Sequence, residues 1–213
     1  MKAASLSEAR SDLVKSRVLE GVAQVLGRRQ ALTYANVAEA AGVPERTLYR
    51  HFPTRELLLR AVFDWSNMRI GFRGELPKDG SEVAALARRV FPGFDEIAPV
   101  IVELLIAPEG RLARLAEKSA RQRASLAVVR HELGSSDSAS GRRLAALLQL
   151  LTTAATWQTL RDYWDMDGAE AAETVALAVE LLLEGARAQA ARSKGRKQAK
   201  RAKKSKPTKE TGA

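Results

Sequence analysis

The sequence predicts an all-α protein, and three observations lead to this prediction. Apolar residues make up 46% of the 213 residues, and only 14 Gly and 7 Pro interrupt a chain dominated by Ala, Leu and Arg. Apolar side chains recur three and four residues apart, as they do on one face of a helix. Segments that contain Gly or Pro separate these periodic stretches. A chain of this length buries a sizeable core in one or two domains.

The first helix is predicted to begin at Ser11, after a flexible arm at residues 1–10, and to end near Arg28. Apolar residues recur along one of its faces: Val14, Val18, Val22, Val25 and Leu26. We expect this face to pack on Leu48 and Phe52, which are four residues apart and therefore point the same way.

Residues 33–52 indicate two short helices joined by a tight turn. Thr33 is a good N-cap for the first, because its hydroxyl accepts one of the N–H groups that a helix start leaves unpaired. Gly42 closes that helix in a left-handed conformation at little steric cost, and Pro44 opens the next one. With Leu48 and Phe52 turned inward, an exposed face remains for an outside partner: Arg46, Tyr49, Arg50 and His51. A helix-turn-helix recognition element has this organisation.

The same segment resembles the DNA-binding motif of the TetR family of bacterial transcriptional regulators. The matching residues are Thr33, Val37, Ala38, Ala41, Gly42, Val43, Thr47, Leu48, Tyr49, His51, Phe52 and Arg55. Pro44 departs from the family pattern, which often has Ser as the cap. The resemblance implies a three-helix DNA-binding domain at residues 11–53, followed by a larger helical ligand-binding and dimerisation domain at residues 54–186.

Three residues of the second short helix are predicted to contact bases: Glu45, Arg46 and Arg50. Arg46 and Arg50 share a face because they are four residues apart, and Arg binds guanine O6 and N7 bidentately. Six residues are predicted to contact the DNA backbone: Thr33, Tyr34, Thr47, Tyr49, His51 and Arg55. The resemblance implies these roles at the positions that match. The alternatives are partial core packing for Tyr49 and a helix C-terminal cation for His51.

Further helices are predicted after residue 53. Thr54 caps one that runs to about Phe72 and connects the DNA-binding domain to the rest of the chain. Two more are expected at residues 81–91 and 95–107, separated by a turn at Pro92 and Gly93. A long charged helix follows at residues 111–133, with an inner face of Leu112, Leu115, Ala116, Leu126 and Val129. Residues 134–141 are expected to form a flexible loop.

Residues 144–155 and 175–183 are apolar almost all round, so every face of these two helices needs a covering surface. Two such helices from each of two copies would form a four-helix bundle at a dimer interface, an arrangement that the resemblance also implies. The alternative is a monomer in which other helices cover both. The predicted interface residues are Leu147, Leu151, Ala154, Val175, Val179 and Leu182.

The resemblance further implies an effector pocket inside the helical domain, whose occupancy moves the connecting helix and changes the spacing of the two DNA-binding domains. Aromatic and Met side chains are the candidate lining residues: Trp65, Met68, Phe91, Phe94, Trp157, Tyr163 and Trp164. Ordinary core packing is the alternative for each of them. By default the ligand is an apolar or amphipathic small molecule.

Basic residues concentrate at the C-terminus. Residues 187–213 hold eleven Lys or Arg and one acidic residue, which leaves 24 basic and 24 acidic residues in the preceding 186. Residues 1–60 carry a net charge of +4. The C-terminal stretch is predicted to be a mostly disordered tail that grips DNA nonspecifically, with a merely solubilising tail as the alternative.

Other classes of function find little support in the sequence. The absence of Cys excludes disulfides and thiolate metal sites, and the two His residues lack metal-ligand spacing. Phosphate-binding and nucleophile-elbow motifs are also missing, so we expect no enzyme, no catalytic residue, no metal and no cofactor. The chain start is no signal peptide, and residues 144–160 carry too many polar groups for a membrane span. A cytoplasmic, nucleoid-associated location is therefore expected.

The sequence thus predicts a homodimeric transcriptional regulator that binds double-stranded DNA at a palindromic operator, as a repressor released by a small-molecule effector. One alternative is an architectural or weakly specific DNA-binding protein whose affinity comes mainly from the basic tail. Another is an α-helical interaction protein without DNA, which would require the match at residues 33–55 to be accidental.

Overall fold

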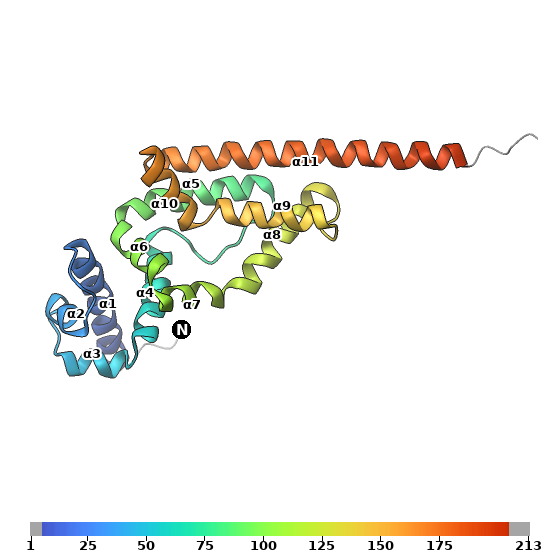
Figure 1. Cartoon of the computed structure of the whole chain (residues 1–213). Helices are drawn as coiled ribbons and strands as arrows, with labels where there is room; N and C mark the ends of the chain where they lie inside the picture. The colour runs from blue at the N-terminus through green and yellow to red at the C-terminus, as the bar shows by residue number, and fades with distance from the viewer. Residues whose placement is uncertain (1–5, 205–213) are drawn as a thin grey trace, which may run out of the picture.

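The computed structural model describes residues 6–204, and this part of the chain forms eleven α-helices and no strand (Figure 1). The predicted all-α fold is therefore confirmed. Helices α1 to α3 form a small head at one end of the molecule, and the other helices form an elongated body. The long α11 lies along one side of the body (Figure 1).

The head consists of α1 (Leu6–Gly27), α2 (Tyr34–Ala41) and α3 (Glu45–His51). The predicted packing of the first helix is confirmed, because Val18, Val22 and Val25 are fully buried in one cluster with Leu48 and Phe52. Helix α1 begins five residues before Ser11, so half of the predicted arm is helical. Residues 1–5 of that arm lie outside the described residues.

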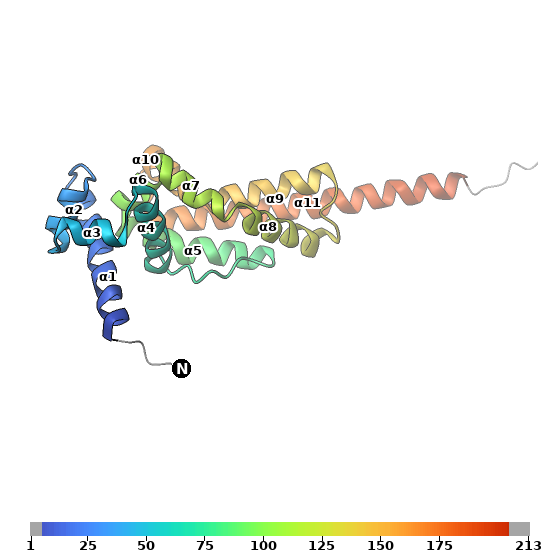
Figure 2. The same ribbon diagram turned by 90° about the horizontal axis from the view of Figure 1, so that it is seen from below.

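Helix α4 (Arg55–Arg69) leaves the head and enters the body, as the view from below in Figure 2 makes clear. Thr54 caps it as predicted, since its hydroxyl accepts a hydrogen bond from the Leu57 N–H at 3.2 Å. The helix ends at Arg69, three residues before the predicted end. Gly71 follows with φ of 77°, a left-handed conformation that favours Gly and stops the helix.

Helix α5 (Gly80–Glu96) continues through Pro92 and Gly93, so the predicted turn at this position is wrong. Its buried face extends past the proline, from Val83 to Phe94, and the free energy of that burial outweighs the local cost of Pro inside a helix. A Cβ at Gly93 would lie 2.6 Å from the Cα of Ile70, so Gly permits a close approach of α5 to the end of α4.

The segment after α5 divides into more helices than the sequence predicts. Helix α6 (Ala98–Ile106) is followed by α7 (Pro108–Ala116) and α8 (Lys118–Leu133). The expected single helix at residues 111–133 is therefore broken at Glu117. Leu112 and Leu115 of its predicted inner face are exposed, because α7 turns other residues toward α4 and α6.

The last part of the chain forms α9 (Ala139–Leu151), α10 (Ala154–Trp164) and α11 (Gly168–Lys204). The predicted helix at residues 144–155 thus spans the junction of two helices. Helix α11 packs mainly along α5, and this contact buries Val175 and Val179 to 1% and 2% exposure. These two residues belong to the core of a single chain, so their assignment to a dimer interface is wrong.

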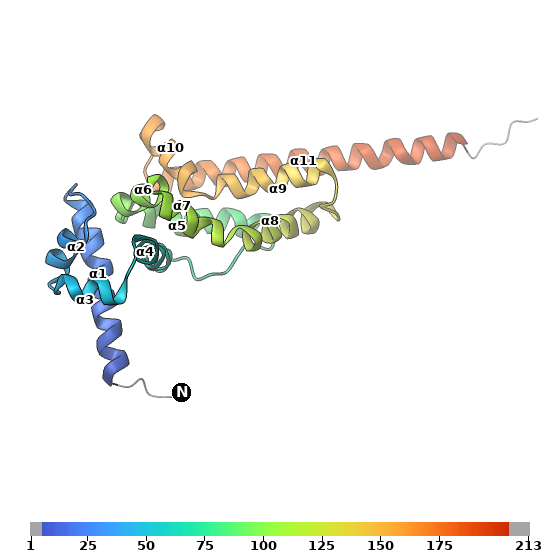
Figure 3. The same cartoon turned by 60° about the horizontal axis from the view of Figure 1, so that its bottom comes forward.

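Helix α11 projects beyond the body on the side away from the head, and the views in Figures 1, 2 and 3 agree on this arrangement. The prediction of disorder from residue 187 onward is therefore wrong up to Lys204. Ala, Arg, Lys and Gln are strong helix formers, and an already formed helix is extended at little cost. Residues 205–213 of the predicted tail lie outside the described residues.

Candidate DNA-binding surface and ligand cavity

The turn between α2 and α3 has the geometry of a helix-turn-helix. The Thr33 hydroxyl accepts a hydrogen bond from the Asn36 N–H at 3.2 Å and so caps α2. Gly42 ends that helix with φ of 63° and ψ of 37°. Pro44 is the N-cap of α3 and has no side chain that could accept a hydrogen bond, which is the structural consequence of its departure from the family pattern. Both predicted turn signals are thus confirmed.

Helix α3 exposes the three residues that were predicted to contact bases. Glu45, Arg46 and Arg50 are all exposed. No ion pair or side-chain hydrogen bond occupies any of them within the part of the chain that the structure describes. Leu48, on the opposite face, is fully buried. The helix therefore presents free charged groups outward while its apolar side is fixed in the core of the head.

Two tyrosines stack beside this helix. The rings of Tyr34 and Tyr49 lie 4.3 Å apart between centroids, with 17° between their planes. The Tyr34 hydroxyl donates a hydrogen bond of 2.7 Å to the carbonyl of Phe52, and burial raises the pKa of Tyr34. Its single hydroxyl donor is therefore already used within the head, and its contact with a phosphate stays a prediction. Tyr49 keeps an exposed edge while its ring packs on Tyr34.

Arg55 does not point freely toward an outside phosphate. Its Nη1 donates to the carbonyl of Leu32 at 2.9 Å, and its Nη2 donates to Glu103 at 2.6 Å. Its Nε lies 3.6 Å from Oε1 of Glu109. These partners come from the head and from α6 and α7, so Arg55 links the two parts of the molecule. Both ends of its guanidinium are engaged within the protein, and its contact with the DNA backbone stays a prediction.

His51 sits at the end of α3 with its Nε2 buried and without a hydrogen-bond partner. Burial lowers the pKa of His51, and the nearby charges of Arg50 and Lys15 lower it further. The neutral form is therefore favoured, which contradicts the alternative of a helix C-terminal cation. The buried Nε2 also cannot reach a phosphate in this arrangement. Thr33 and Thr47, by contrast, retain solvent-accessible surface.

A cavity of about 440 Å³ lies inside the body, a size typical of small-molecule sites. Seven helices, α4 to α10, contribute to its walls. Its apolar lining includes Phe63, Ile70, Phe72, Leu86, Val90, Phe94, Ile101, Leu104, Leu105, Leu115 and Leu150. Ser66, Asn67, Gln149, Thr152 and Thr153 add polar groups, and Ala154 and Ala155 complete the wall at the junction of α9 and α10.

One wall of the cavity is basic. Arg111 and Arg114 of α7 and Lys118 and Arg121 of α8 line it, and none of the lining residues is acidic. This group was not predicted from the sequence, although its spacing of three, four and three residues is typical of one helical face. The apolar residues of the same segment recur at helical spacing too, and they led to the prediction of an apolar inner face at these positions. Burial lowers the pKa of Arg121 and of Arg114, which shows that both guanidinium groups are partly desolvated.

Of the seven residues predicted to line an effector pocket, Phe94 alone lines this cavity. Phe91 and Trp157 are fully buried core residues, and the Trp157 indole donates to Asp95 at 2.9 Å. Trp65 packs at the edge of the core near Arg69. Three residues lie on the surface, at exposures of 72% for Met68, 82% for Tyr163 and 70% for Trp164. These six residues therefore lie outside this cavity, because aromatic character alone does not reveal which face of a helix is enclosed.

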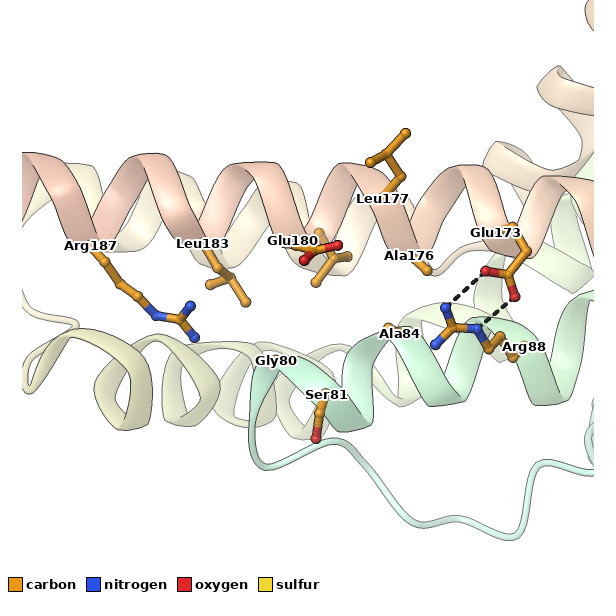
Figure 4. Close-up of a pocket in the computed structure, with 11 residues that line it drawn as sticks. Gly80, Ser81, Ala84, Arg88, Glu173, Ala176, Leu177, Glu180, Leu183 and Arg187 are labelled. Atoms are coloured by element: carbon orange, nitrogen blue, oxygen red, sulfur yellow. Dashed lines mark hydrogen bonds and ion pairs between the residues drawn. The ribbon is translucent and has the colours of Figure 1, made fainter.

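A second hollow, of about 460 Å³, lies between the first half of α5 and α11 (Figure 4). Arg88 and Glu173 form a bidentate ion pair across it, at 2.7 and 2.8 Å. Arg187 at its other end is paired with Glu132. Both arginines are therefore neutralised by acidic groups, and the hollow lies on an outer face of the body. Leu177 also lines this hollow, and Figure 4 shows its side chain directed away from α5.

Apolar side chains remain uncovered on α9 and α11. Leu147 and Leu150 of α9 are exposed, as are Leu177 and Leu181 of α11. Leu151 and Leu182, two of the predicted interface residues, are half-buried. Ala154 lines the cavity instead. Of the predicted interface residues, Leu147 therefore faces outward, and Leu150, Leu177 and Leu181 are exposed apolar residues that were not predicted.

Among the residues that the structure describes, no helix combines the length and apolar character needed to cross a membrane. Residues 30–62 match the family model described as bacterial regulatory proteins, tetR family. The matched range covers α2, α3 and the first half of α4, which includes the whole helix-turn-helix. No curated protein and no solved structure matches the chain. The matched family model and the helix-turn-helix geometry together support membership of the TetR family of bacterial transcriptional regulators, and they identify the head as a DNA-binding domain of that family.

Proposed function

We propose that the protein is a dimeric repressor that binds a palindromic operator and releases it when a small molecule occupies the cavity of the body. One observation carries this proposal: α3 presents Glu45, Arg46 and Arg50 without internal partners, in a chain of a DNA-binding family. Free charged groups on a short, firmly anchored helix are suited to reading base edges in the major groove. As a regulator of promoters, the protein would act at the nucleoid.

In this proposal Arg46 and Arg50 bind guanines, and Glu45 accepts from the exocyclic amine of cytosine. Thr33, Thr47 and the exposed edge of Tyr49 contact phosphates and so position α3 in the groove. Tyr34, His51 and Arg55 act within the protein. Tyr34 fixes the end of α3 through Phe52, and Arg55 fixes the start of α2 through Leu32.

Dimerisation is supported by the uncovered leucines of α9 and α11. A soluble monomer seldom leaves a row of large apolar side chains exposed without a partner surface. Leu177 and Leu181 are four residues apart and therefore form one stripe along α11, and Leu147 and Leu150 supply a matching stripe on α9. We propose that these stripes pair across a two-fold axis. Two-fold symmetry of the protein then requires a palindromic site.

The link from the cavity to the head runs through α6 and α7. Leu104 and Leu105 of α6 line the cavity. The neighbouring Glu103, also in α6, pairs with Arg55 at the junction with the head. Glu109, near the start of α7, approaches the same guanidinium, and one of its carboxylate oxygens is buried without a partner. A ligand that displaces α6 or α7 would therefore also displace Arg55 and the head. Release of DNA requires only that the ligand binds this displaced arrangement more tightly.

The proposal is tested by selecting DNA sites from a random pool with the full-length protein and measuring affinity for the best site and for random duplex. We expect a palindrome. Arg46→Ala should cost about 1–3 kcal/mol on the selected site, mostly at one base pair, and little on random DNA. Equal losses on both duplexes would contradict the role of Arg46 in base reading.

A second function is favoured by a specific observation, the basic C-terminal stretch. Its eleven Lys or Arg residues would suit an architectural protein that binds DNA with weak site preference. Helix α11 carries this stretch away from the head (Figure 3), which favours contact with DNA outside the operator. Removing residues 187–213 should then weaken binding to all duplexes alike and reduce its salt dependence. A changed site preference in the truncated protein would contradict this role.

A further inference from the structure

We propose that the cavity of the body binds an amphipathic anion: a molecule with an apolar chain or ring system and a carboxylate or phosphate group. This assignment rests on the proposed function only in its regulatory consequence, because binding itself can be measured without DNA. Apolar residues line one side of the cavity and basic residues line the other, and this distribution favours a ligand with an apolar part and an anionic group.

The apolar part of the ligand would occupy the side formed by α4, α5 and α6. Phe63, Phe94 and Leu104 are almost fully buried in the single chain and form a firm wall there. Burial of apolar surface against such a wall supplies most of the affinity of small ligands. Nothing on this side would pair with a charged group, except the amide of Asn67 and the hydroxyl of Ser66, and Ser66 already donates to the Phe63 carbonyl at 2.8 Å.

The opposite side supplies uncompensated positive charge. Arg111, Lys118 and Arg121 have no ion pair or side-chain hydrogen bond within the described residues. Arg121 is the innermost of them, with its guanidinium 5.7 Å from the centroid of the Phe72 ring. The acidic group that acts on Arg121 is Glu117, and Glu117 is already paired with Arg60 at 3.3 Å.

Arg114 has a different task from the other three. It donates to the carbonyls of Leu104 and Leu105, close to the C-terminal end of α6, and so holds α7 against α6. An anion drawn to the basic wall would compete for this guanidinium and disturb the contact between the two helices. The same two helices carry Glu103 and Glu109, the partners of Arg55. The ligand charge would thus act at the point where the body holds the head.

Charge complementarity decides between ligand classes. A cationic ligand would meet four like charges and no lining carboxylate, and a neutral one would leave the partly desolvated Arg121 unpaired. An anion forms charge-assisted hydrogen bonds with Arg and removes that cost. Because carboxylate and phosphate share this chemistry, the experiment includes both.

The test is isothermal titration calorimetry of the full-length protein with four probes of equal chain length: sodium decanoate, decyl phosphate, decanol and decylamine. We expect at least one of the two anions to bind at least about tenfold more tightly than decanol, and decylamine to bind more weakly still. Decanol binding as tightly as both anions, or no binding of either anion, would overturn the proposal. Tighter binding of decanoate or of decyl phosphate identifies the head group.

Arg121→Gln should reduce the affinity for the tighter anion about tenfold or more and leave that for decanol unchanged. Arg123→Gln is the matched control, because Arg123 is exposed on the same helix and does not line the cavity. Arg121→Lys retains the charge and should restore most of the binding, which separates a loss of charge from a disturbed fold. Equal effects of the substitutions at residues 121 and 123 would overturn the assignment.

A second measurement distinguishes this inference from the proposed function. Fluorescence anisotropy of the selected operator should show release on addition of the tighter anion and no release with decanol. Binding of the anion in the calorimeter without release of DNA would uphold the ligand class and contradict the effector role. Release by a neutral or cationic molecule that displaces the anion would overturn the ligand class and uphold regulation by an effector.

Discussion

Arg55 joins three segments that are far apart in the sequence. Its guanidinium contacts the Leu32 carbonyl in the head, Glu103 in α6 and Glu109 in α7. Both carboxylates are more buried than the arginine itself, with side-chain exposures of 17% and 27% against 37%. Removing the cation would therefore leave two partly desolvated anions close together, which is more costly than the loss of an exposed pair.

We predict that Arg55→Gln lowers the free energy of unfolding by about 1–2 kcal/mol. Arg60→Gln is the matched control on the same helix, since Arg60 is equally exposed but pairs with the more exposed Asp64 and Glu117. It should cost less than about 1 kcal/mol. Urea denaturation of the two variants measures both effects. Equal losses would mean that Arg55 contributes no more than an ordinary surface pair.

His51 gives the folded protein a pH dependence of predictable sign. Because its folded-state pKa lies below the unfolded value of about 6.5, the unfolded chain binds a proton first as the pH falls. Stability is therefore full above about pH 6.5 and is lost as the pH falls toward the lowered pKa. Below that pKa both states are protonated and the loss is complete. The physical cause is the burial of the ring near Arg50 and Lys15.

We predict that His51→Gln flattens the dependence of the unfolding free energy on pH just below neutrality. The chain has one other histidine, His131, whose side chain is 66% exposed. His131→Gln should therefore keep the slope of the unmodified protein. Urea midpoints measured at several pH values between about 5 and 7.5 compare the three proteins. An unchanged slope in His51→Gln would show that other groups cause the dependence.

At the scale of single elements, α5 shows how packing overrides a local signal. Pro92 and Gly93 form a dipeptide typical of turns, yet the helix continues to Glu96. Apolar residues on both sides of the dipeptide, from Val83 to Phe94, form one buried face. The missing side chain of Gly93 then lets α5 lie directly against Ile70 at the end of α4. The glycine is required for a close approach and not for a turn.

We predict that Gly93→Ala lowers the free energy of unfolding by about 1–3 kcal/mol, because the added methyl group would overlap the backbone of Ile70. Gly195→Ala is the matched control, since a Cβ at this exposed position in α11 meets nothing within 4 Å. That substitution should cause no loss, because Ala is the better helix former. Thermal denaturation followed by circular dichroism compares the two. A neutral Gly93→Ala would show that α4 and α5 move apart at little cost.

At the scale of the whole molecule, the head is joined to the body by the covalent link of α4 (Figure 2), by the packing of α1 against α4 and α6, and by the ion pairs of Arg55. Any regulatory signal must pass through α4 or through contacts such as that of Arg55. The body in turn uses Glu132 to tie three elements together, because it accepts from the Gly80 N–H at 2.8 Å and pairs with Arg187 on α11. The cavity is lined by α4 and α6, which also contact α1 of the head, so its occupancy can affect the position of the head.

We predict that the double substitution of Leu177 and Leu181 by Glu converts the proposed dimer into a monomer and sharply weakens binding to the proposed palindromic site. Four like charges brought together at a two-fold interface would repel each other, whereas each exposed position tolerates Glu in a single chain. Met68→Glu is the control, since Met68 is 72% exposed and lies on a different helix. Analytical ultracentrifugation gives the oligomeric state. A double variant that remains dimeric would place the interface on another face.

The local features of the head could be predicted from the sequence. Thr33, Gly42 and Thr54 act through their own backbone conformation and immediate neighbours, so their roles follow from residue type and spacing alone. The buried face of α1 and the inward direction of Leu48 likewise follow from helical periodicity. Because Leu48 points inward, Glu45, Arg46 and Arg50 are left on the exposed face of α3, and this face could therefore be predicted too.

Long-range contacts decided the rest. The family resemblance predicts a DNA contact for Arg55, and the position at a helix start predicts one for Tyr34. Their hydrogen-bond acceptors Glu103 and Phe52, however, lie 48 and 18 residues away in the sequence. The basic wall could not be predicted either, because the sequence pattern of a charged helical face is the same whether that face borders solvent or a cavity. The sequence by itself thus determined the helical fold and the DNA-binding element. Only the tertiary structure decided which polar groups are satisfied internally and which remain free, because that depends on elements brought together by packing.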